Sequence, residues 1–247
     1  MRRANVLIVI LLASLAVVLL ACGKDDATKS AASAKAATTT TAAPPTTTSQ
    51  AVPPRSSNDG CRAVAPATPR ADSSRRRPRE RLSRKRDYIA TIRTNCGTIR
   101  IRLDVRRAPK TTASFAALAR SRFFDGLSFQ RIAKPGGHDF VIQGGDPLGT
   151  GEGGPGYTVV EKPPRGIRYR RYTVAMAKSQ VQPPGTSGSQ FFIVTGADAN
   201  LDPVYAVLGE VRGDKRAVRR IAAVPTDLEA PVDPVVMSSV RITSRRR

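Results

Sequence analysis

The sequence predicts a mainly β fold, a closed antiparallel β-barrel with two helices. Three observations predict it. Short runs of β-type residues follow one another along the second half of the 247-residue chain, glycine and proline separate them, and two segments have helical periodicity. The folded part is expected over residues 87–247, which is long enough for one good core.

The first predicted element is a β-hairpin. Apolar and polar residues alternate on both sides of the turn "TNCGT". A helix should begin at Pro109, because Phe115, Leu118 and Ala119 fall on one helical face. Further strands are predicted in "SFQRI", "DFVIQ", "YTVAMA", "SQFFIV", "YAVLGEV" and "MSSVRITS", and a second short helix in "GDKRAVRRIAAV".

Residues 1–21 are expected to be a secretory signal of the lipoprotein type. Arg2 and Arg3 precede an apolar run over residues 6–21, which is short for a bilayer-spanning helix of about 20 residues. "LLAC" resembles a bacterial lipobox, so Cys22 is the expected lipidation site. The expected location is the extracytoplasmic face of the cell membrane. An uncleaved N-terminal anchor is the alternative.

Residues 22–86 are predicted to be a disordered linker. The first part is rich in Ala, Thr, Ser and Pro and cannot bury enough apolar surface to fold. Residues 62–86 carry ten Lys/Arg and two acids. Two interpretations stay open for this basic part: attraction to anionic lipid or wall polymer, or a solvated spacer that repels itself. Nucleic acid is not an expected partner, because no aromatic residues are interleaved with the arginines.

The remaining cysteines, Cys61 and Cys96, form an even pair. In an oxidising compartment a disulfide between them is expected, and two free thiols are the alternative. The chain has one histidine and no Cys/His cluster with metal-ligand spacing, so neither a metal nor another cofactor is expected.

The glycine-rich stretch over residues 140–157 contains seven glycines in eighteen residues. A phosphate-binding loop needs glycines that lead into a helix N-terminus, with a lysine to meet the charge. Here the glycines lead into "YTVVEKPP", which has no helix signal. The stretch is therefore predicted to be a strand followed by a long surface loop.

Five blocks in order resemble the cyclophilin family of peptidyl-prolyl cis-trans isomerases: "LSFQRI", "DFVIQGGDPLGTGEGGPGY", "YTVAMAKS", "GSQFFIV" and "LDPVYAVLGEV". The resemblance extends from about Tyr88 to Ile242. It implies an eight-stranded barrel closed at each end by a helix, with the substrate groove on its outer face. With the lipobox, it implies a bacterial, actinobacterial-like lipoprotein. The implied partners are proline-containing peptides and unfolded exported proteins, and a monomer is expected.

The same resemblance assigns the site. Arg131, in "FQRI", stands at the position of the family's catalytic arginine. The implied substrate-binding residues are Phe140, Val141, Gln143, Ala177, Lys178, Gln190, Phe192, Leu201 and Tyr205. The apolar members should line a socket for the proline ring, and the two glutamines should bond the substrate backbone and orient Arg131. Ala177 and Lys178 should edge the groove, where the Lys178 backbone could pair with the peptide. Without the resemblance, the apolar residues read as core and the glutamines as surface.

Two functions of different class follow. The first is an isomerase that assists the folding of exported proteins at the cell envelope. The second is a cyclophilin-like peptide-binding chaperone or scaffold with incidental or no isomerase activity. A third alternative, a lipoprotein that binds anionic polymer, depends only on charge: residues 87–247 carry 25 Lys/Arg and 14 acids, a net charge of +11.

Overall fold

The computed structural model describes residues 60–70 and 74–247. The expected signal over residues 1–21, the expected lipidation site Cys22 and the linker residues 23–59 lie outside the described residues. In the described ranges, no helix combines the length and the apolar composition needed to cross a membrane.

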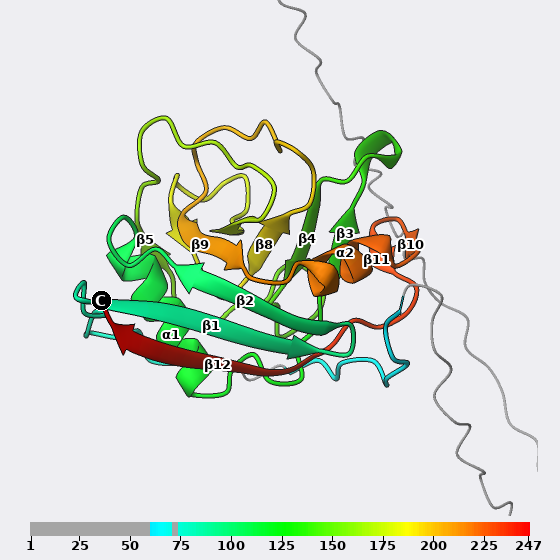
Figure 1. Cartoon of the computed structure of the whole chain (residues 1–247), viewed down its shortest axis with the longest axis horizontal. Coiled ribbons are helices and arrows are strands. Elements are labelled where there is room, and N and C mark those ends of the chain that lie inside the picture. The colour runs from blue at the N-terminus through cyan, green and yellow to red at the C-terminus, as the bar shows by residue number, and fades with distance from the viewer. Residues whose placement is uncertain (1–59, 71–73) are drawn as a thin grey trace, which may run out of the picture. The chain divides into compact units, whose positions relative to one another are not determined.

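Eight strands form one antiparallel sheet in the order β12-β1-β2-β9-β6-β8-β4-β3 (Figure 1). The strands are β1 (Arg86–Thr94), β2 (Gly97–Leu103), β3 (Arg131–Ala133), β4 (Val141–Gly144), β6 (Thr173–Met176), β8 (Phe191–Val194), β9 (Val207–Arg212) and β12 (Met237–Arg246). The predicted hairpin is β1 and β2, whose last pair is Thr94 opposite Gly97. Each of the other six predicted strand segments overlaps one of these strands.

Main-chain hydrogen bonds join the two edges of this sheet. The N–H of Gly126 donates to the carbonyl of Met237, and the N–H of Met237 donates to the carbonyl of Leu127, both at 2.8 Å. The N–H of Phe129 donates to the carbonyl of Val235 at 2.8 Å. Because these residues lead into β3 and β12, the sheet curls round into a barrel. The predicted mainly β, eight-stranded antiparallel fold with two helices is confirmed.

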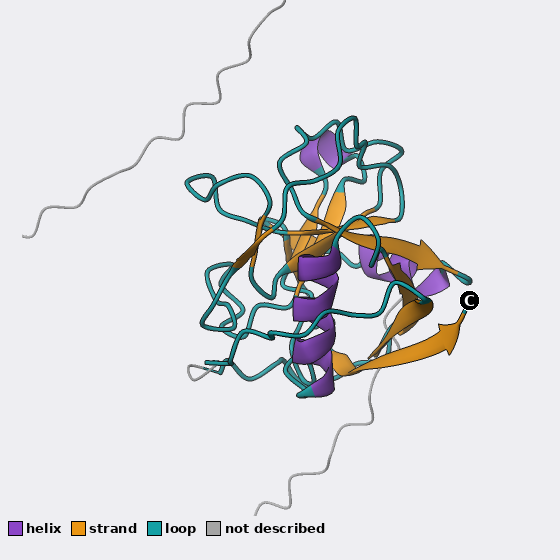
Figure 2. Cartoon of the chain, turned by 90° about the vertical axis from the view of Figure 1, so that its left-hand side faces the viewer, coloured by secondary structure: helices purple, strands orange, loops and turns teal. Residues whose placement is uncertain are grey.

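The two predicted helices are α1 (Pro109–Arg120) and α2 (Arg216–Ala223). As predicted, α1 begins at its proline and buries Phe115, Leu118 and Ala119. Helix α1 packs against β12 and β9, and α2 packs against β2 and β4. Figure 1 shows the two helices at opposite ends of the sheet, and Figure 2 shows α1 standing in front of the strands.

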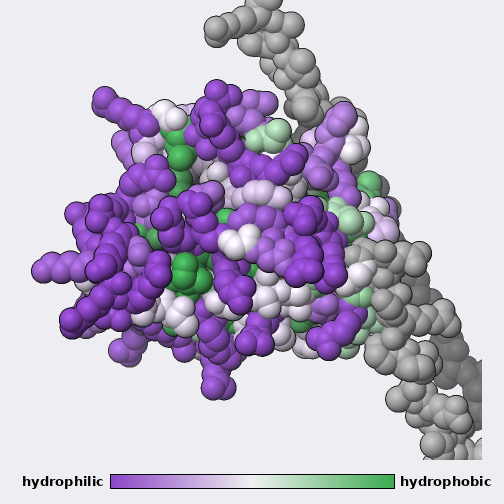
Figure 3. Space-filling model, in the orientation of Figure 1, coloured by the Kyte–Doolittle hydropathy of each residue, from purple (hydrophilic) through white to green (hydrophobic). Residues whose placement is uncertain are grey.

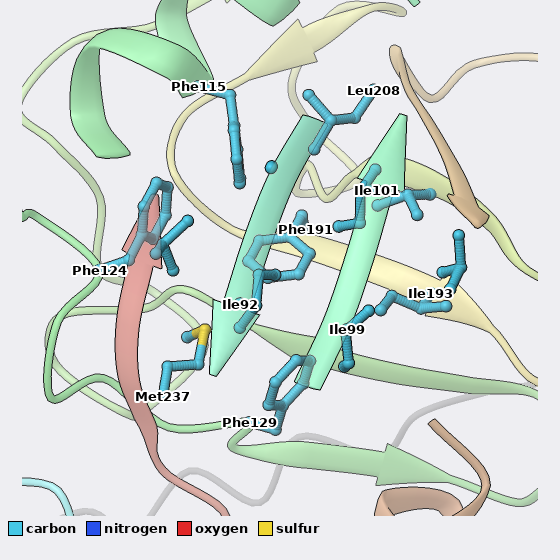
Figure 4. Packing of buried hydrophobic residues seen from close by; sticks show 14 of the residues in the cluster. Ile92, Ile99, Ile101, Phe115, Phe124, Phe129, Phe191, Ile193, Leu208 and Met237 are labelled. Carbon is cyan, nitrogen blue, oxygen red and sulfur yellow. The ribbon is translucent and has the colours of Figure 1, made fainter. Parts of the chain in front are cut away.

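The inner core fills the barrel with aliphatic and aromatic side chains (Figure 4). The ring of Phe191 meets those of Phe115 and Phe129 edge-to-face, with centroids 5.6 Å and 5.8 Å apart. Ile99 and Ile101 of β2 turn toward the same space and are fully buried. The predicted alternation along the strands is what sends these residues inward.

Five short elements were not predicted. They are the 3-10 helix η1 (Pro135–Gly137) and the strands β5 (Val159–Val160), β7 (Thr186–Ser187), β10 (Thr226–Asp227) and β11 (Ala230–Pro231). The last two form a hairpin of their own, and β5 pairs with β7. These pieces have two or three residues each, too few for a periodic pattern.

The disulfide between Cys61 and Cys96 is present, with Cα atoms 4.1 Å apart. Hydrogen bonds surround it: Arg62 N–H donates to the carbonyl of Asn95 at 3.0 Å, and Asn95 Nδ2 donates to the carbonyl of Arg62 at 2.7 Å. Both cysteines are buried in the inner core. The bridge fixes the start of the described chain to the turn between β1 and β2.

Contacts join the described part of the basic segment to the barrel. Residues 60–70 and 74–86 lie against the barrel rather than away from it. The guanidinium groups of Arg70 and Arg75 stand 5.8 Å and 5.6 Å from the centroid of the Phe123 ring, and Arg70 also donates to the carbonyl of Phe123. Arginine over an aromatic face gains cation–π attraction while its aliphatic stem covers apolar surface. Burial accordingly lowers the pKa of Arg70.

Hydrophilic side chains cover most of the face of the barrel seen in Figure 3. This surface agrees with the excess of arginine and lysine in the sequence.

Candidate active site

A second group of apolar residues lies apart from the inner core. This outer apolar cluster consists of buried Ala133, Val141, Tyr169, Ala175, Phe192, Val194, Ala199 and Val207, with partly buried Phe140, Ile167, Ala177, Leu201 and Tyr205 packed against it. It includes every apolar residue that the sequence assigns to the substrate-binding site. The members on β4, β6, β8 and β9 alternate with inner-core residues, so they face the outside of the barrel.

Aromatic contacts hold this cluster together. The rings of Phe192 and Tyr205 meet edge-to-face with centroids 5.4 Å apart. Tyr169 is fully buried; its hydroxyl donates to the carbonyl of Tyr205 at 2.7 Å and accepts from the N–H of Tyr205 at 3.0 Å. Burial raises the pKa of Tyr169 to about 12. Tyr205 is therefore fixed through both its ring and its backbone.

Strand register places the polar residues beside this cluster. Arg131 on β3 lies opposite Gln143 on β4, and Gln143 lies opposite Phe192 on β8. Residues directly opposite each other in antiparallel strands share one face of the sheet. Arg131, Gln143 and Phe192 therefore form a row across three strands. Within it, Nη1 of Arg131 lies 3.4 Å from Oε1 of Gln143.

Gln190 connects this row to the glycine-rich loop. Its Oε1 accepts from Nε2 of Gln143 at 2.8 Å and from Nε2 of Gln130 at 3.2 Å. Its Nε2 donates to the carbonyls of Gly151 and Gly153 at 2.7 Å and 2.9 Å. The predicted influence of Gln190 on Arg131 thus runs through Gln143, which bonds both.

A buried carboxylate organises the glycine-rich loop. Asp146 is 1% exposed, and its Oδ1 accepts from the N–H of Leu148 at 2.8 Å. A Cβ atom added to Gly153 would lie 1.9 Å from that oxygen, so only glycine fits there. As predicted, the stretch is a strand followed by a surface loop, and no helix follows it.

The loop forms one wall of a surface cavity of about 610 Å³. Gln143, Gln190, Ala177 and Lys178 line the same cavity, so the two predicted glutamines and the two predicted edge residues meet in one groove, whereas Arg131 is not among its lining residues. The side chain of Lys178 is folded back: its Nζ donates to the carbonyls of Ser179 and Gln182 at 2.9 Å and 3.0 Å. The ammonium group also lies 5.8 Å from the centroid of the Tyr205 ring, which links the cavity to the outer apolar cluster.

Sequence reasoning missed Glu229, which contacts the predicted catalytic arginine. Nε of Arg131 lies 2.6 Å from Oε2 of Glu229, and Nη2 lies 3.3 Å from Oε1. An ion pair this exposed stabilises a fold by about 0–1 kcal/mol. Glu229 and its neighbour Leu228 have φ values of 73° and 45°, a left-handed conformation that costs a non-glycine residue about 1–2 kcal/mol. No local pattern could reveal the contact, because 98 residues separate its partners.

Comparison with known proteins gives a consistent result. The family described as "Cyclophilin type peptidyl-prolyl cis-trans isomerase/CLD" matches residues 89–242. Peptidyl-prolyl cis-trans isomerase A of Mycobacterium tuberculosis is 38% identical over 173 residues, covering 62% of this chain and 91% of that protein. Peptidyl-prolyl cis-trans isomerase B of Streptomyces anulatus is 38% identical over 177 residues, covering 63% of this chain and 97% of that protein.

Solved structures agree. The crystal structure of a Cryptosporidium parvum cyclophilin type peptidyl-prolyl cis-trans isomerase matches with a TM-score of 0.59 and 29% identity, covering 64% of this chain and 99% of that one. A crystal structure of the same protein in the presence of the dipeptide Ala-Pro matches with a TM-score of 0.58 and 30% identity, at the same coverage. The chain described here therefore belongs to the cyclophilin-type peptidyl-prolyl cis-trans isomerases.

Proposed function

We propose that this isomerase uses Arg131 to stabilise the twisted amide of an X–Pro bond whose proline ring occupies the outer apolar cluster. One observation carries the proposal: Arg131 and Gln143 share a row with Phe192, so a charged donor stands beside an apolar surface. Phe192 and Val141 are nearly buried, whereas Phe140, Leu201 and Tyr205 keep part of their surface open. That open surface is the proposed binding surface for the proline ring of the substrate.

The chemistry needs no nucleophile. Resonance gives the amide C–N bond partial double-bond character and a rotation barrier of about 18–20 kcal/mol. As the bond twists, the nitrogen loses conjugation and gains a lone pair that can accept a hydrogen bond. A guanidinium fixed beside that nitrogen interacts more strongly with the twisted amide than with the planar one, and only such a difference accelerates the reaction. Arginine suits the task because it stays charged and holds its donors in a plane.

The decisive experiment compares wild type with Arg131→Ala in a protease-coupled isomerisation assay. Loss of one donor to a transition state lowers the rate by about 10²–10³-fold, and we expect a fall in kcat/KM of that order. The matched control is Arg212→Ala, because Arg212 is also a partly exposed arginine in an ion pair, with Glu210. Equal isomerase activity of Arg131→Ala and wild type would remove the proposed mechanism. Activity at the uncatalysed rate in both proteins would leave a peptide-binding chaperone as the better description.

We also propose that the enzyme acts on exported proteins from the outer face of the cell membrane, held there by lipid on Cys22. The signal-like pattern over residues 1–21 supports this location, as does a disulfide, which persists in oxidising compartments. In a bacterial host, Cys22→Ser should move the protein from the membrane fraction to the soluble fraction. Unchanged membrane association of Cys22→Ser would instead favour an uncleaved N-terminal anchor.

A further inference from the structure

The turn that carries Glu229 has an unusual backbone. Strands β10 and β11 pair Asp227 with Ala230, which leaves a two-residue loop of Leu228 and Glu229. Both loop residues have positive φ, as in the hairpin turn that favours Asn-Gly. Neither leucine nor glutamate suits that conformation, and Leu228 is 96% exposed, so inward packing of its side chain does not hold the turn. Unfavourable backbone of this kind persists when neighbouring contacts determine it, and it is concentrated at functional sites.

A backbone bond holds this turn against the strand that carries Arg131. The N–H of Ile132 donates to the carbonyl of Glu229 at 2.7 Å. Strand β3 is the last strand in the order of the main sheet, and the hairpin of β10 and β11 lies on that edge. The main chain of Glu229 is thus fixed one residue along from Arg131. Its carboxylate reaches the guanidinium from a set position.

The carboxylate occupies only one side of the guanidinium. Oε2 and Oε1 of Glu229 take the Nε–H and one Nη2–H of Arg131, at 2.6 Å and 3.3 Å. Of the five N–H donors of a guanidinium, one on Nη1 and one on Nη2 are left, because Nη1 also donates to Oε1 of Gln143 at 3.4 Å. A two-point contact of this kind fixes the plane of the guanidinium as well as its position.

We propose that Glu229 is a positioning residue for isomerisation: it holds the plane of the Arg131 guanidinium so that the Nη donors face the prolyl nitrogen. The proposal rests on the role proposed above for Arg131. Glu229 itself touches no substrate atom. An exposed ion pair by itself returns less stability than the left-handed turn costs, so the ion pair alone does not account for the turn.

The test separates kcat from KM for Glu229→Ala and Glu229→Gln, with an Ala-Pro-containing peptide as the substrate. A displaced catalytic group can lower a rate by up to about 100-fold, and we expect Glu229→Ala to lower kcat about tenfold. KM should change by less than about twofold, because the contact matters in the twisted state. Glu229→Gln keeps an oxygen for the Nε–H and should retain more activity than Glu229→Ala. The control is Glu210→Ala, which removes an ion pair of similar exposure with Arg212.

Two further measurements keep this result distinct from the role of Arg131 itself. In the Arg131→Ala background, Glu229→Ala should have no additional effect, because it acts only through Arg131. The ¹⁵N resonance of Arg131 Nε–H should be sharp in wild type and broadened or shifted in Glu229→Ala. If Arg131→Ala abolishes activity while Glu229→Ala leaves kcat unchanged or raises it, the positioning role is refuted and the catalytic role of Arg131 stands. If Arg131→Ala is fully active, the catalytic role fails first.

Discussion

Phe191 and Phe192 are neighbours on β8, but they lie on opposite faces of the sheet. Phe191 is fully buried in the inner core, surrounded by other phenylalanine rings. Phe192 belongs to the outer apolar cluster and is 4% exposed, under the partly open Tyr205. The chain's own side chains fill the inner face completely, whereas the outer face keeps apolar surface that another molecule can cover. The same residue type therefore serves stability on one face and, in the proposed mechanism, binding on the other.

The largest expected effect is on the free energy of unfolding, which should distinguish Phe191 on the inner face from Phe192 on the outer face. Truncation of a fully buried phenylalanine typically costs about 3–5 kcal/mol, because it removes buried apolar area and leaves a cavity. Phe191→Ala should lower the free energy of unfolding by that amount, measured by denaturant titration. Its kcat/KM, corrected for the folded fraction, should stay near that of wild type. A large loss of corrected activity would mean that the inner core also shapes the groove.

Phe192→Ala should show the opposite balance. The free energy of unfolding should fall by less than in Phe191→Ala, because the outer apolar cluster around Phe192 has fewer buried members than the inner core around Phe191. The proposed site for the proline ring would lose one wall, and kcat/KM should fall about 10–100-fold, the range for one lost apolar contact in a pocket. Measured together, the two variants form a matched pair. Equal stability losses and equal activity losses would contradict the division between the faces.

The smallest expected effect concerns Tyr169, the buried phenol of the outer apolar cluster. Tyr169→Phe removes its two hydrogen bonds to the backbone of Tyr205, each worth about 1 kcal/mol. It should also change the pH dependence of stability. The pKa of Tyr169 is about 12 in the folded protein, against a usual value of 10.0, so the folded state holds this proton more tightly. The contribution of this bound proton to the free energy of unfolding is complete below pH 10 and is lost as the pH rises to 12.

Wild type should therefore lose free energy of unfolding between pH 10 and pH 12, and Tyr169→Phe should lose less over the same interval. Denaturant titrations at both ends of this interval measure the difference. Parallel slopes in the two proteins would show that Tyr169 ionises as easily in the folded chain as in the unfolded one.

Local sequence periodicity was sufficient to predict the strands and helices that show it. Alternation predicted the hairpin of β1 and β2, and the helical spacing from Pro109 predicted α1. Prediction of the candidate site required more than local periodicity. Only the order of five blocks pointed to Arg131, and only the register of β3, β4 and β8 shows that it stands in a row with Gln143 and Phe192. Period-two reasoning assigns a residue to a face, but it does not choose which strands become neighbours.

Two features escaped prediction because long-range contacts determine them. Residues 62–86 have the composition of a disordered spacer, yet in the described part a disulfide and arginines over Phe123 hold them to the barrel. The two turn residues Leu228 and Glu229 are not among those that favour a two-residue hairpin turn. The conformation of the turn follows from its bonds to Ile132 and Arg131, far away in the sequence.

The bridge between Cys61 and Cys96 turns the intervening chain into a closed ring of covalent bonds. A trypsin-like protease that cuts after an arginine within residues 62–86 opens that ring without releasing either piece. Whatever is attached upstream of Cys61 keeps its hold on the barrel until the disulfide is reduced. A mechanical pull from that side likewise enters at the turn between β1 and β2 and bypasses the basic segment altogether.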